Sequence, residues 1–296
     1  GTKSNKQGLG VKAKLFTNHD DETPQLRTLV TSRGYLGSDQ AILHFGLGEA
    51  STAARLELSW PSGLTQIIKN LDAGRHHHIV EGGGANATPP VIQSELVFEA
   101  LPSLSRVKHA EKCYDDFARE PLLPNKLSQF GPGQAWSDVN GDGVDDFYLG
   151  QGKGAPGRLI ILRDRQGGLK PMPLPNDGDF EDMGCLFFDA DGDGDQDLYI
   201  VSGGVECEDD EDSLQDRLYL NDGAGKMTLA PKGALPLARH SGSCVSAADF
   251  DRDGDLDLFI GGRTVPGYYP TAAASQLLRN EGGGRFVDVT SDLAPA

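Results

Sequence analysis

Three nine-residue segments rich in aspartate recur in the second half of the chain, and a short apolar run follows each one. They span residues 138–146, 189–197 and 249–257, and share the pattern D-x-[DN]-x-D-G-x-x-D. A second strand-like run follows downstream of each segment, at 158–161, 217–220 and 276–278. Repeats of about 50 to 60 residues, built from short β runs and glycine turns, are typical of propeller blades of about four strands. The sequence therefore predicts an all-β fold.

The acidic positions of these segments suit a bound cation. Side-chain oxygens at positions 1, 3, 5 and 9 can converge when the chain curls, and a carbonyl at position 7 completes a ring. Glycine at position 6 supplies the backbone torsion that the curl needs. Hard oxygen ligands in this number favour calcium over magnesium, zinc or copper. The predicted ligands of about three calcium ions are Asp138, Asn140, Asp142, Val144 and Asp146; Asp189, Asp191, Asp193, Asp195 and Asp197; and Asp249, Asp251, Asp253, Asp255 and Asp257.

Two other interpretations of the loops were weighed. An EF-hand needs a bidentate glutamate at position 12, where this chain has Leu149, Ile200 and Ile260, and its flanks would be helical rather than strand-like. A single acidic turn is also explained by ordinary Asx-turn chemistry without any ion. Because three copies occur in register, the calcium interpretation is favoured. We expect the ions to staple blades rather than to catalyse a reaction.

The charge of the chain limits its function classes. It has 27 basic and 44 acidic residues and a net charge of −17, and the predicted side-chain ligands at positions 1, 3, 5 and 9 carry eleven of the negative charges. Three calcium ions would bring the net charge to −11. A chain this acidic repels phosphate backbones, so nucleic acid is not expected as a partner. No apolar run approaches the roughly 18 residues that a transmembrane helix needs.

The first third of the chain is predicted to be β-rich. Apolar and polar residues alternate from Ala54 to Trp60, Trp60–Gly63 has turn chemistry, and the next strand starts at Thr65. The HFGLG segment, residues 44–48, reads as a strand end that enters a glycine turn. Residues 85–90 read as a linker. The expected organisation is a β domain over 1–84, a linker with entry strands over 85–130, and three repeats at 131–181, 182–241 and 242–296.

The calcium loops resemble those of the FG-GAP or VCBS repeat family, which occur in integrin α-chain propellers. The resemblance covers residues 131–296 and implies the side-chain ligands given above. The first loop departs from the other two at Asn140, which implies weaker ion binding there. Three repeats are too few for a closed ring, which usually needs at least four blades. The remainder of a ring would come from residues 92–130 or from outside this sequence.

Residues 1–84 resemble the ASPIC/UnbV domain, which accompanies FG-GAP repeats in cartilage acidic protein and in large secreted or surface proteins of bacteria. The matching motifs lie at residues 5–11, 44–48, 60–63 and 79–82. The implied fold is a small β domain joined to a partial or small β-propeller with calcium loops. The implied location is extracellular, at the cell surface or periplasmic.

Other candidate sites carry less weight. On a strand only His76 and His78 would share a face, so a solvated face is favoured over a metal site. A catalytic His44 is disfavoured, and the acidic run 208–212 reads as a solvated insertion, with a calcium or cationic-partner role as the alternative. The four cysteines have no CxxC spacing, which leaves disulfides or buried free thiols open. No hydrolase, P-loop or zinc-protease motif is present.

These observations predict a non-enzymatic, calcium-binding interaction or adhesion module whose partner is a protein or a glycan. The alternative is an accessory, carbohydrate-binding domain of a polysaccharide-active surface protein. A third hypothesis is purely architectural spacing within a large surface protein.

Overall fold

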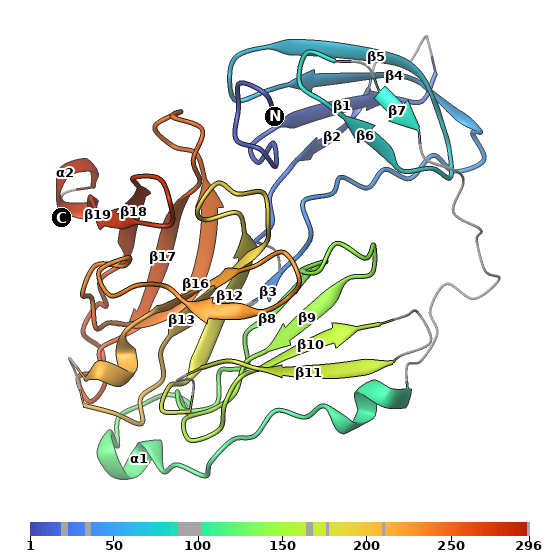
Figure 1. Cartoon of the computed structure of the whole chain (residues 1–296). Coiled ribbons are helices and arrows are strands. Elements are labelled where there is room, and N and C mark those ends of the chain that lie inside the picture. Colours follow the sequence, from blue (N-terminus) through green and yellow to red (C-terminus); the bar gives the residue numbers. More distant parts are fainter. Residues whose placement is uncertain are drawn as a thin grey trace. The chain divides into compact units, whose positions relative to one another are not determined.

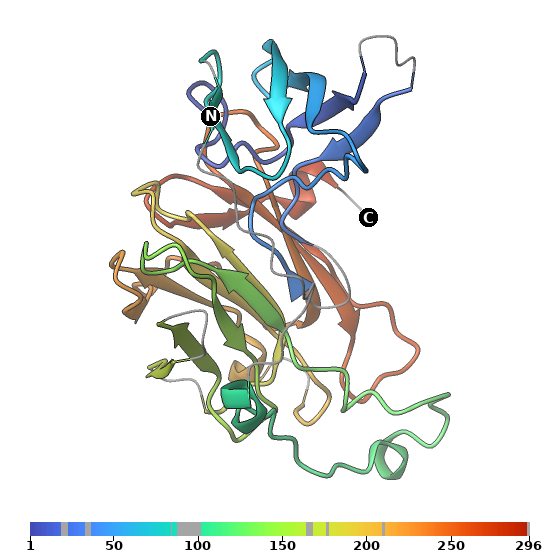
Figure 2. The same cartoon turned by 90° about the vertical axis from the view of Figure 1, so that its right-hand side faces the viewer.

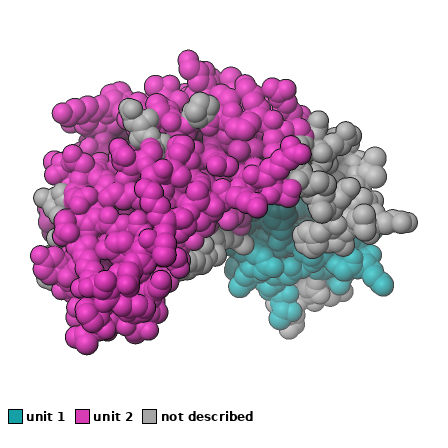
Figure 3. All heavy atoms as spheres, turned by 90° about the horizontal axis from the view of Figure 1, so that it is seen from below, with its two compact units in different colours: residues 1–30, 41–100, 248–254 teal, residues 31–40, 101–247, 255–296 magenta. Residues whose placement is uncertain are grey.

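The computed structural model describes residues 1–18, 23–32, 37–83, 85–87, 102–163, 168–175, 178–208 and 211–294. The chain divides into two compact units, coloured separately in Figure 3. The first contains residues 1–30, 41–100 and 248–254, and the second contains 31–40, 101–247 and 255–296. The domain boundaries expected from the sequence stay a prediction.

The first unit is built on a four-stranded antiparallel sheet in the order β2-β1-β4-β5. Its strands are β1 (Lys12–Phe16), β2 (Gln25–Thr28), β4 (Thr52–Ser59) and β5 (Thr65–Asp72). The alternation predicted around Ala54–Trp60 is confirmed, since Leu56 and Leu58 of β4 are buried beside Ala13 and Leu15 of β1. The predicted strand after Thr65 is also confirmed.

Two local predictions in the first unit were wrong. Residues 42–47 have no regular secondary structure, so HFGLG contains no strand end, although a turn does follow at Gly48 and Glu49. Ala85–Ala87 form β7, which pairs with β6 (His77–Ile79) instead of acting as a linker. The residue types of this segment did not reveal that its backbone would pair with β6. Residues 88–90 of the predicted linker lie outside the described residues.

The second unit contains three blade-like sheets in chain order (Figures 1 and 2). The first blade is β8 (Gln134–Ser137), β9 (Asp146–Leu149), β10 (Arg158–Leu162) and β11 (Leu169–Pro173), with β3 (Gly37–Ser38) added parallel to β8. The second is β12 (Asp182–Phe188), β13 (Asp197–Ser202), β14 (Arg217–Asn221) and β15 (Met227–Leu229). The third is β16 (Ser241–Ala248), β17 (Asp257–Thr264), β18 (Gln276–Asn280) and β19 (Phe286–Asp288).

Each acidic segment lies between the first and second strands of its blade, as the strand-like flanks predicted. In the second blade Phe188 pairs with Asp197 at the loop end of the hairpin, whereas Asp182 pairs with Ser202 at the other end. The downstream apolar runs are the third strands, β10, β14 and β18. An all-β fold with blade-type repeats is therefore confirmed.

Neighbouring blades share apolar cores. One buried cluster combines side chains of the first and second blades: Ala135, Val139, Tyr148, Leu159, Ile161 and Leu174 with Cys185, Phe187, Leu198, Ile200, Tyr219 and Met227. Phe188 of the second blade meets Phe286 of the third edge-to-face, with ring centroids 6.2 Å apart. Because the blades bury each other's faces, the acidic loops are held on a rigid base.

The other face of the first blade packs differently. Phe147, Leu149, Ile160 and Leu162 form a buried cluster against which Leu104 and Val107 pack. Leu104 belongs to the short helical turn η1 (Pro102–Arg106), and helix α1 (Asp116–Arg119) follows. The described part of 92–130, residues 102–130, adds no strand to the blades. The remaining short helices are η2 (Asp212–Leu214) and α2 (Thr290–Leu293), and no helix among the described residues is long and apolar enough to cross a membrane.

Candidate metal centre

The three loops share one backbone conformation. Glycine at position 6 is left-handed in all three, with φ of 83° at Gly143, 102° at Gly194 and 104° at Gly254. Position 4 is left-handed as well, and in the third loop it is Arg252, with φ of 70°. A residue with a Cβ is strained there, which the sequence pattern did not reveal.

Position 9 is a buried brace in every loop. Asp146, Asp197 and Asp257 are 0%, 0% and 1% exposed. In the second loop Asp197 accepts hydrogen bonds from the amide of Ala190 at 2.8 Å and from that of Asn221 at 2.8 Å. Asp146 does the same with the amides of Val139 and Leu162, at 3.2 and 2.7 Å. This carboxylate ties each loop to the third strand of its own blade.

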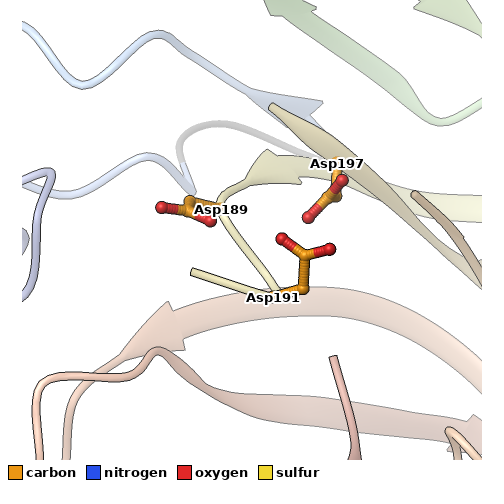
Figure 4. A group of neighbouring side chains, drawn as sticks. All are labelled: Asp189, Asp191 and Asp197. Carbon is orange, nitrogen blue, oxygen red and sulfur yellow. The ribbon is translucent and has the colours of Figure 1, made fainter. Parts of the chain in front are cut away.

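Two of the loops gather carboxylates. Asp189, Asp191 and Asp197 each offer an oxygen within 4.8 Å of the other two, and the carboxyl groups of Asp191 and Asp197 face each other (Figure 4). Asp249, Asp251 and Asp257 form the equivalent group in the third loop. These oxygens come from side chains braced by loop amides: Asp189 accepts from Gly192 at 2.8 Å, and Asp249 accepts from Arg252 at 2.7 Å. Three hard oxygen donors in one place fit a calcium ion.

The electrostatics of the second loop point the same way. Burial raises the pKa of Asp197 to about 7; the amides of Asn221 and Ala190 oppose this shift, and the charges of Asp191 and Asp193 add to it. Burial also raises the pKa of Asp191, with the charges of Asp193 and Asp189 contributing. Like charges held this close favour proton uptake, and a divalent cation would remove that preference.

The first loop differs from the other two at position 3, where it has Asn140 instead of an aspartate. Its residues are all described, yet they form no comparable group of three acidic side chains within 4.8 Å. Asp138 accepts hydrogen bonds from the amides of Gly141, Asp142 and Gly143, at 2.8, 3.1 and 2.7 Å. Asn140 occupies position 3 and accepts from the Asp142 amide at 2.9 Å. Both oxygens of Asp138 thus face the loop's own backbone, and Asp249 of the third loop likewise accepts from the amides of Arg252 and Gly254.

The remaining predicted ligands lie outside the two carboxylate groups. Asp193 sits beside its group: its Oδ1 accepts from the Asp195 amide at 2.9 Å, and its own amide donates to Asp191 at 3.2 Å. Asp253 donates its amide to Asp251 at 3.2 Å. A ligand role for these two side chains, for Asp142, and for the carbonyls of Val144, Asp195 and Asp255 stays a prediction.

The motifs of the first unit have structural roles. Glu81 is 3% exposed, and one of its oxygens accepts hydrogen bonds from the amides of Thr2, Lys3 and Ser4, each within 2.8 Å. Burial opposes ionisation, but hydrogen bonds from Ser62 and from these amides lower the pKa of Glu81 overall. Asn5 makes two bonds to the backbone of Leu9. Through these hydrogen bonds Glu81 connects residues 2–4 to Ser62, which lies in the turn between β4 and β5.

Two family models match separate parts of the chain. A family model described as ASPIC and UnbV matches residues 1–86, and a model described as FG-GAP-like repeat matches residues 189–260. The two matches lie in the order expected from the sequence, with ASPIC and UnbV first and the FG-GAP-like repeat second. The repeat match begins at the first ligand position of the second loop and contains the whole third loop. No curated protein matches the chain.

FG-GAP repeats are typical of extracellular interaction modules and often bind calcium. The two carboxylate groups lie within the matched residues, so family and geometry agree that these loops are able to hold a metal ion. The first blade lies outside the matched residues, yet it has the same loop pattern and the same strand order.

The other candidates from the sequence have ordinary surroundings. His44, His76 and His78 are exposed, and no metal-type group forms around them among the described residues. The described members of the acidic run are exposed or half-exposed, as a solvated insertion predicts, and they form ion pairs: Glu208 with Arg119, Glu211 with Lys153, and Asp212 with Arg239. Asp209 and Asp210 lie outside the described residues. All four cysteines are free thiols: Cys185 and Cys207 are buried, and Cys113 and Cys244 are exposed.

Sequence reasoning missed a second carboxylate cluster, at the end of the second blade opposite its loop. Glu181 precedes β12 and is 3% exposed, and neither of its carboxyl oxygens has a hydrogen-bond partner among the described residues. Burial raises its pKa to about 8, with further contributions from the charges of Glu111, Glu206 and Asp182, partly offset by Lys153. These acids are scattered along the sequence, so no local pattern could reveal them.

Proposed function

We propose that this chain is a non-enzymatic, extracytoplasmic interaction module whose FG-GAP-like blades are stapled by calcium. The observation that carries the proposal is the pair of matching carboxylate groups, at Asp189, Asp191 and Asp197 and at Asp249, Asp251 and Asp257. Each group joins the first and second strands of a blade, so a bound ion would tie down the connection that anchors the blade. The first loop, with the neutral Asn140 at position 3, is proposed as a weaker third site.

The test is thermal unfolding of the full chain after treatment with EDTA and after return of calcium. Extracellular calcium modules bind with Kd values of about 10⁻⁴ to 10⁻³ M, so the titration should extend to about 5 mM. We expect calcium to raise the melting temperature and an equal concentration of magnesium to leave it nearly unchanged, because magnesium demands a tighter octahedral shell. Equal responses to both ions, or none to either, would reject the proposal.

A second candidate function, carbohydrate binding, is favoured by exposed aromatic side chains at the end of the third blade opposite its loop. Tyr268 and Tyr269 are 61% and 46% exposed, and Phe117 of α1 is 40% exposed. The two segments adjoin, since the amide of Tyr269 donates to Glu120 at 2.7 Å. Exposed apolar patches of this kind mark binding surfaces, and tyrosine combines an apolar ring with a polar tip.

A glycan array probed with the wild type and with the double variant Tyr268→Ala/Tyr269→Ala separates the candidates. Leu237→Ala, at a site that is 76% exposed, is the matched control for loss of a surface apolar group. Carbohydrate binding predicts array signals that the tyrosine variant loses and the leucine variant keeps. An empty array for the wild type would leave a protein as the proposed partner. Polysaccharide turnover by purified protein would contradict the non-enzymatic assignment.

A further inference from the structure

Two asparagines occupy equivalent positions at the ends of the third strands of the second and third blades. The amide of Asn221 donates to Asp197 at 2.8 Å, and the amide of Asn280 donates to Asp257 at 2.8 Å. Their side-chain oxygens both accept from the turn that follows, although at different places: Asn221 from Gly225 and Asn280 from Gly282. The backbone of each asparagine is thus fixed by the position-9 ligand of its own loop.

The side-chain amide of each asparagine reaches into two loops. Asn221 Nδ2 donates to the carbonyl of Val139 at 2.8 Å and to that of Gln196 at 3.1 Å. Val139 is position 2 of the first loop and Gln196 is position 8 of the second, so both carbonyls lie between predicted ligands. One nitrogen therefore links the backbones of two neighbouring candidate calcium loops.

The same link recurs between the second and third loops. Asn280 Nδ2 donates to the carbonyl of Ala190 at 2.8 Å and to that of Leu256 at 3.3 Å, which are again position 2 of one loop and position 8 of the next. Both asparagines are buried, at 6% and 1% exposure. A buried bond repeated with the same positions in two places is a property of the repeat rather than an accident of one turn.

Glycines in the turns after the asparagines keep the blades close. A Cβ on Gly225 would lie 3.4 Å from Cγ2 of Val139, and one on Gly284 would lie 3.4 Å from Cβ of Asp191. Both glycines are left-handed, with φ of 78° and 72°. The turn after each third strand therefore rests directly on the loop of the preceding blade.

The first blade provides a natural contrast. Leu162 holds the equivalent place, because its amide donates to Asp146 at 2.7 Å, but its side chain belongs to the apolar cluster beside Leu104 and Val107. That face of the first blade is packed by a non-repeat segment instead of by another calcium loop. The amide side chain is thus present at the two places where a preceding loop lies within reach, and a leucine stands where the neighbour is apolar.

We propose that Asn221 and Asn280 couple neighbouring calcium loops, so that ion binding in one loop raises the calcium affinity of the next. The proposal rests on the proposed calcium binding. An ion orders the backbone around its ligands, and the asparagine passes that order to carbonyls between the ligands of the adjacent loop. The second binding event then costs less ordering, which is positive cooperativity without a large change of structure.

The experiment measures calcium binding to the second loop by isothermal titration of the full chain. The third loop is disabled by Asp251→Asn/Asp253→Asn, and the first loop is either intact or disabled by Asp138→Asn/Asp142→Asn. We expect the intact first loop to tighten binding at the second loop by about fivefold or more, the usual lower range of allosteric coupling. Asn221→Leu introduces leucine, the residue that the first blade has at the equivalent position 162. In this variant, disabling the first loop should change the affinity of the second loop by less than about twofold.

Asn280→Leu is the matched control, because it removes the same bond at the other blade junction and should leave the first ratio unchanged. A second set of titrations measures the coupling between the second and third loops in the same way. There Asn280→Leu should remove the coupling and Asn221→Leu should leave it unchanged, so either variant alone decides the question if the other fails to fold. Coupling that survives in Asn221→Leu, or that falls equally in Asn280→Leu, would overturn the inference. Calcium binding without coupling in the wild type would overturn it alone, whereas no calcium binding at all would overturn the proposed function.

Discussion

The two ends of the second blade both concentrate negative charge, but they accommodate it in different ways. At the loop end, three aspartates turn their oxygens to within 4.8 Å of one another, and loop amides brace them. At the opposite end, Glu181 is buried near Glu111 and Glu206, but no three acidic side chains there come within the same distance among the described residues. The loop end is therefore able to hold a cation, whereas burial among other acids favours the protonated form of Glu181 at the opposite end.

This difference follows from where the acids come from. The aspartates belong to one nine-residue segment whose glycines curl the chain, so local sequence fixes their spacing. Glu111, Glu181 and Glu206 meet only because the blade and the segment before it pack together. Three carboxylates converge on one point more easily when they belong to one turn than when they come from three separate segments.

The largest expected effect tests the bracing of the loop end. Asp197→Ala would leave the buried amides of Ala190 and Asn221 without their acceptor, so we expect the free energy of unfolding to fall by about 3 kcal/mol. Urea unfolding in EDTA measures this independently of any ion. Asp179→Ala, at an exposed site, is the control for loss of a negative charge and should change stability by less than about 0.5 kcal/mol. Equal losses in the two variants would show that the brace contributes nothing.

The second prediction tests the proton at the other end. The pKa of Glu181 is raised from an ordinary value near 4.5 to about 8, so the folded state binds the proton more tightly than the unfolded state. This contribution is fully present below about pH 4.5 and is lost as pH rises to about 8. Glu181→Gln mimics the neutral form, and we expect it to raise the melting temperature at pH 9 but not at pH 4.5.

The calcium response of Glu181→Gln tests whether the two ends of the blade act independently. Glu181→Gln should leave the calcium response of the loops unchanged, because it lies at the far end of the blade. A variant that unfolds more readily at pH 9, or one that loses the calcium response, would break the proposed distinction between the two ends.

A third prediction exchanges position 3 between loops. Asn140→Asp should strengthen calcium binding at the first loop, and Asp191→Asn should weaken it at the second, each by about tenfold, since ligand charge tunes calcium affinity. Isothermal titration of the two variants and of the wild type measures both changes. If neither substitution shifts its site, the carboxylate count does not set affinity in these loops.

The smallest effect concerns the strained position 4 of the third loop. Arg252 has φ of 70°, where the first and second loops have Gly141 and Gly192 at 74° and 84°. Arg252→Gly should stabilise the calcium-free protein by up to about 1 kcal/mol, because glycine adopts this torsion without steric cost. Gly192→Arg is the reverse experiment and should lower the denaturation midpoint. Destabilisation by Arg252→Gly would mean that the arginine side chain contributes more than its backbone costs.

Much of this architecture could be predicted from sequence because it is local and repeated. The acidic pattern placed three loops between strands, and the apolar runs located β10, β14 and β18. Two misses were contacts between distant segments, namely β3 joining the first blade and the Glu181 cluster, and a third was the local pairing of β7 with β6. Asn221 and Asn280 occupy matching places in the sequence repeats. Their hydrogen bonds to the preceding loop could not be predicted, because they depend on how one blade packs on another.

The central claim is that calcium holds the repeat loops together, and differential scanning calorimetry with a calcium titration tests it most directly. If each site is occupied at about ten times its Kd, it adds about 1.4 kcal/mol, so two or three sites should raise the melting temperature by roughly 5–10 °C. We expect that rise with calcium, its reversal by EDTA, and a smaller rise in Asp191→Asn. An unfolding transition that does not move with calcium, in a protein that also binds none by titration, would contradict the account and reduce the loops to ordinary acidic turns.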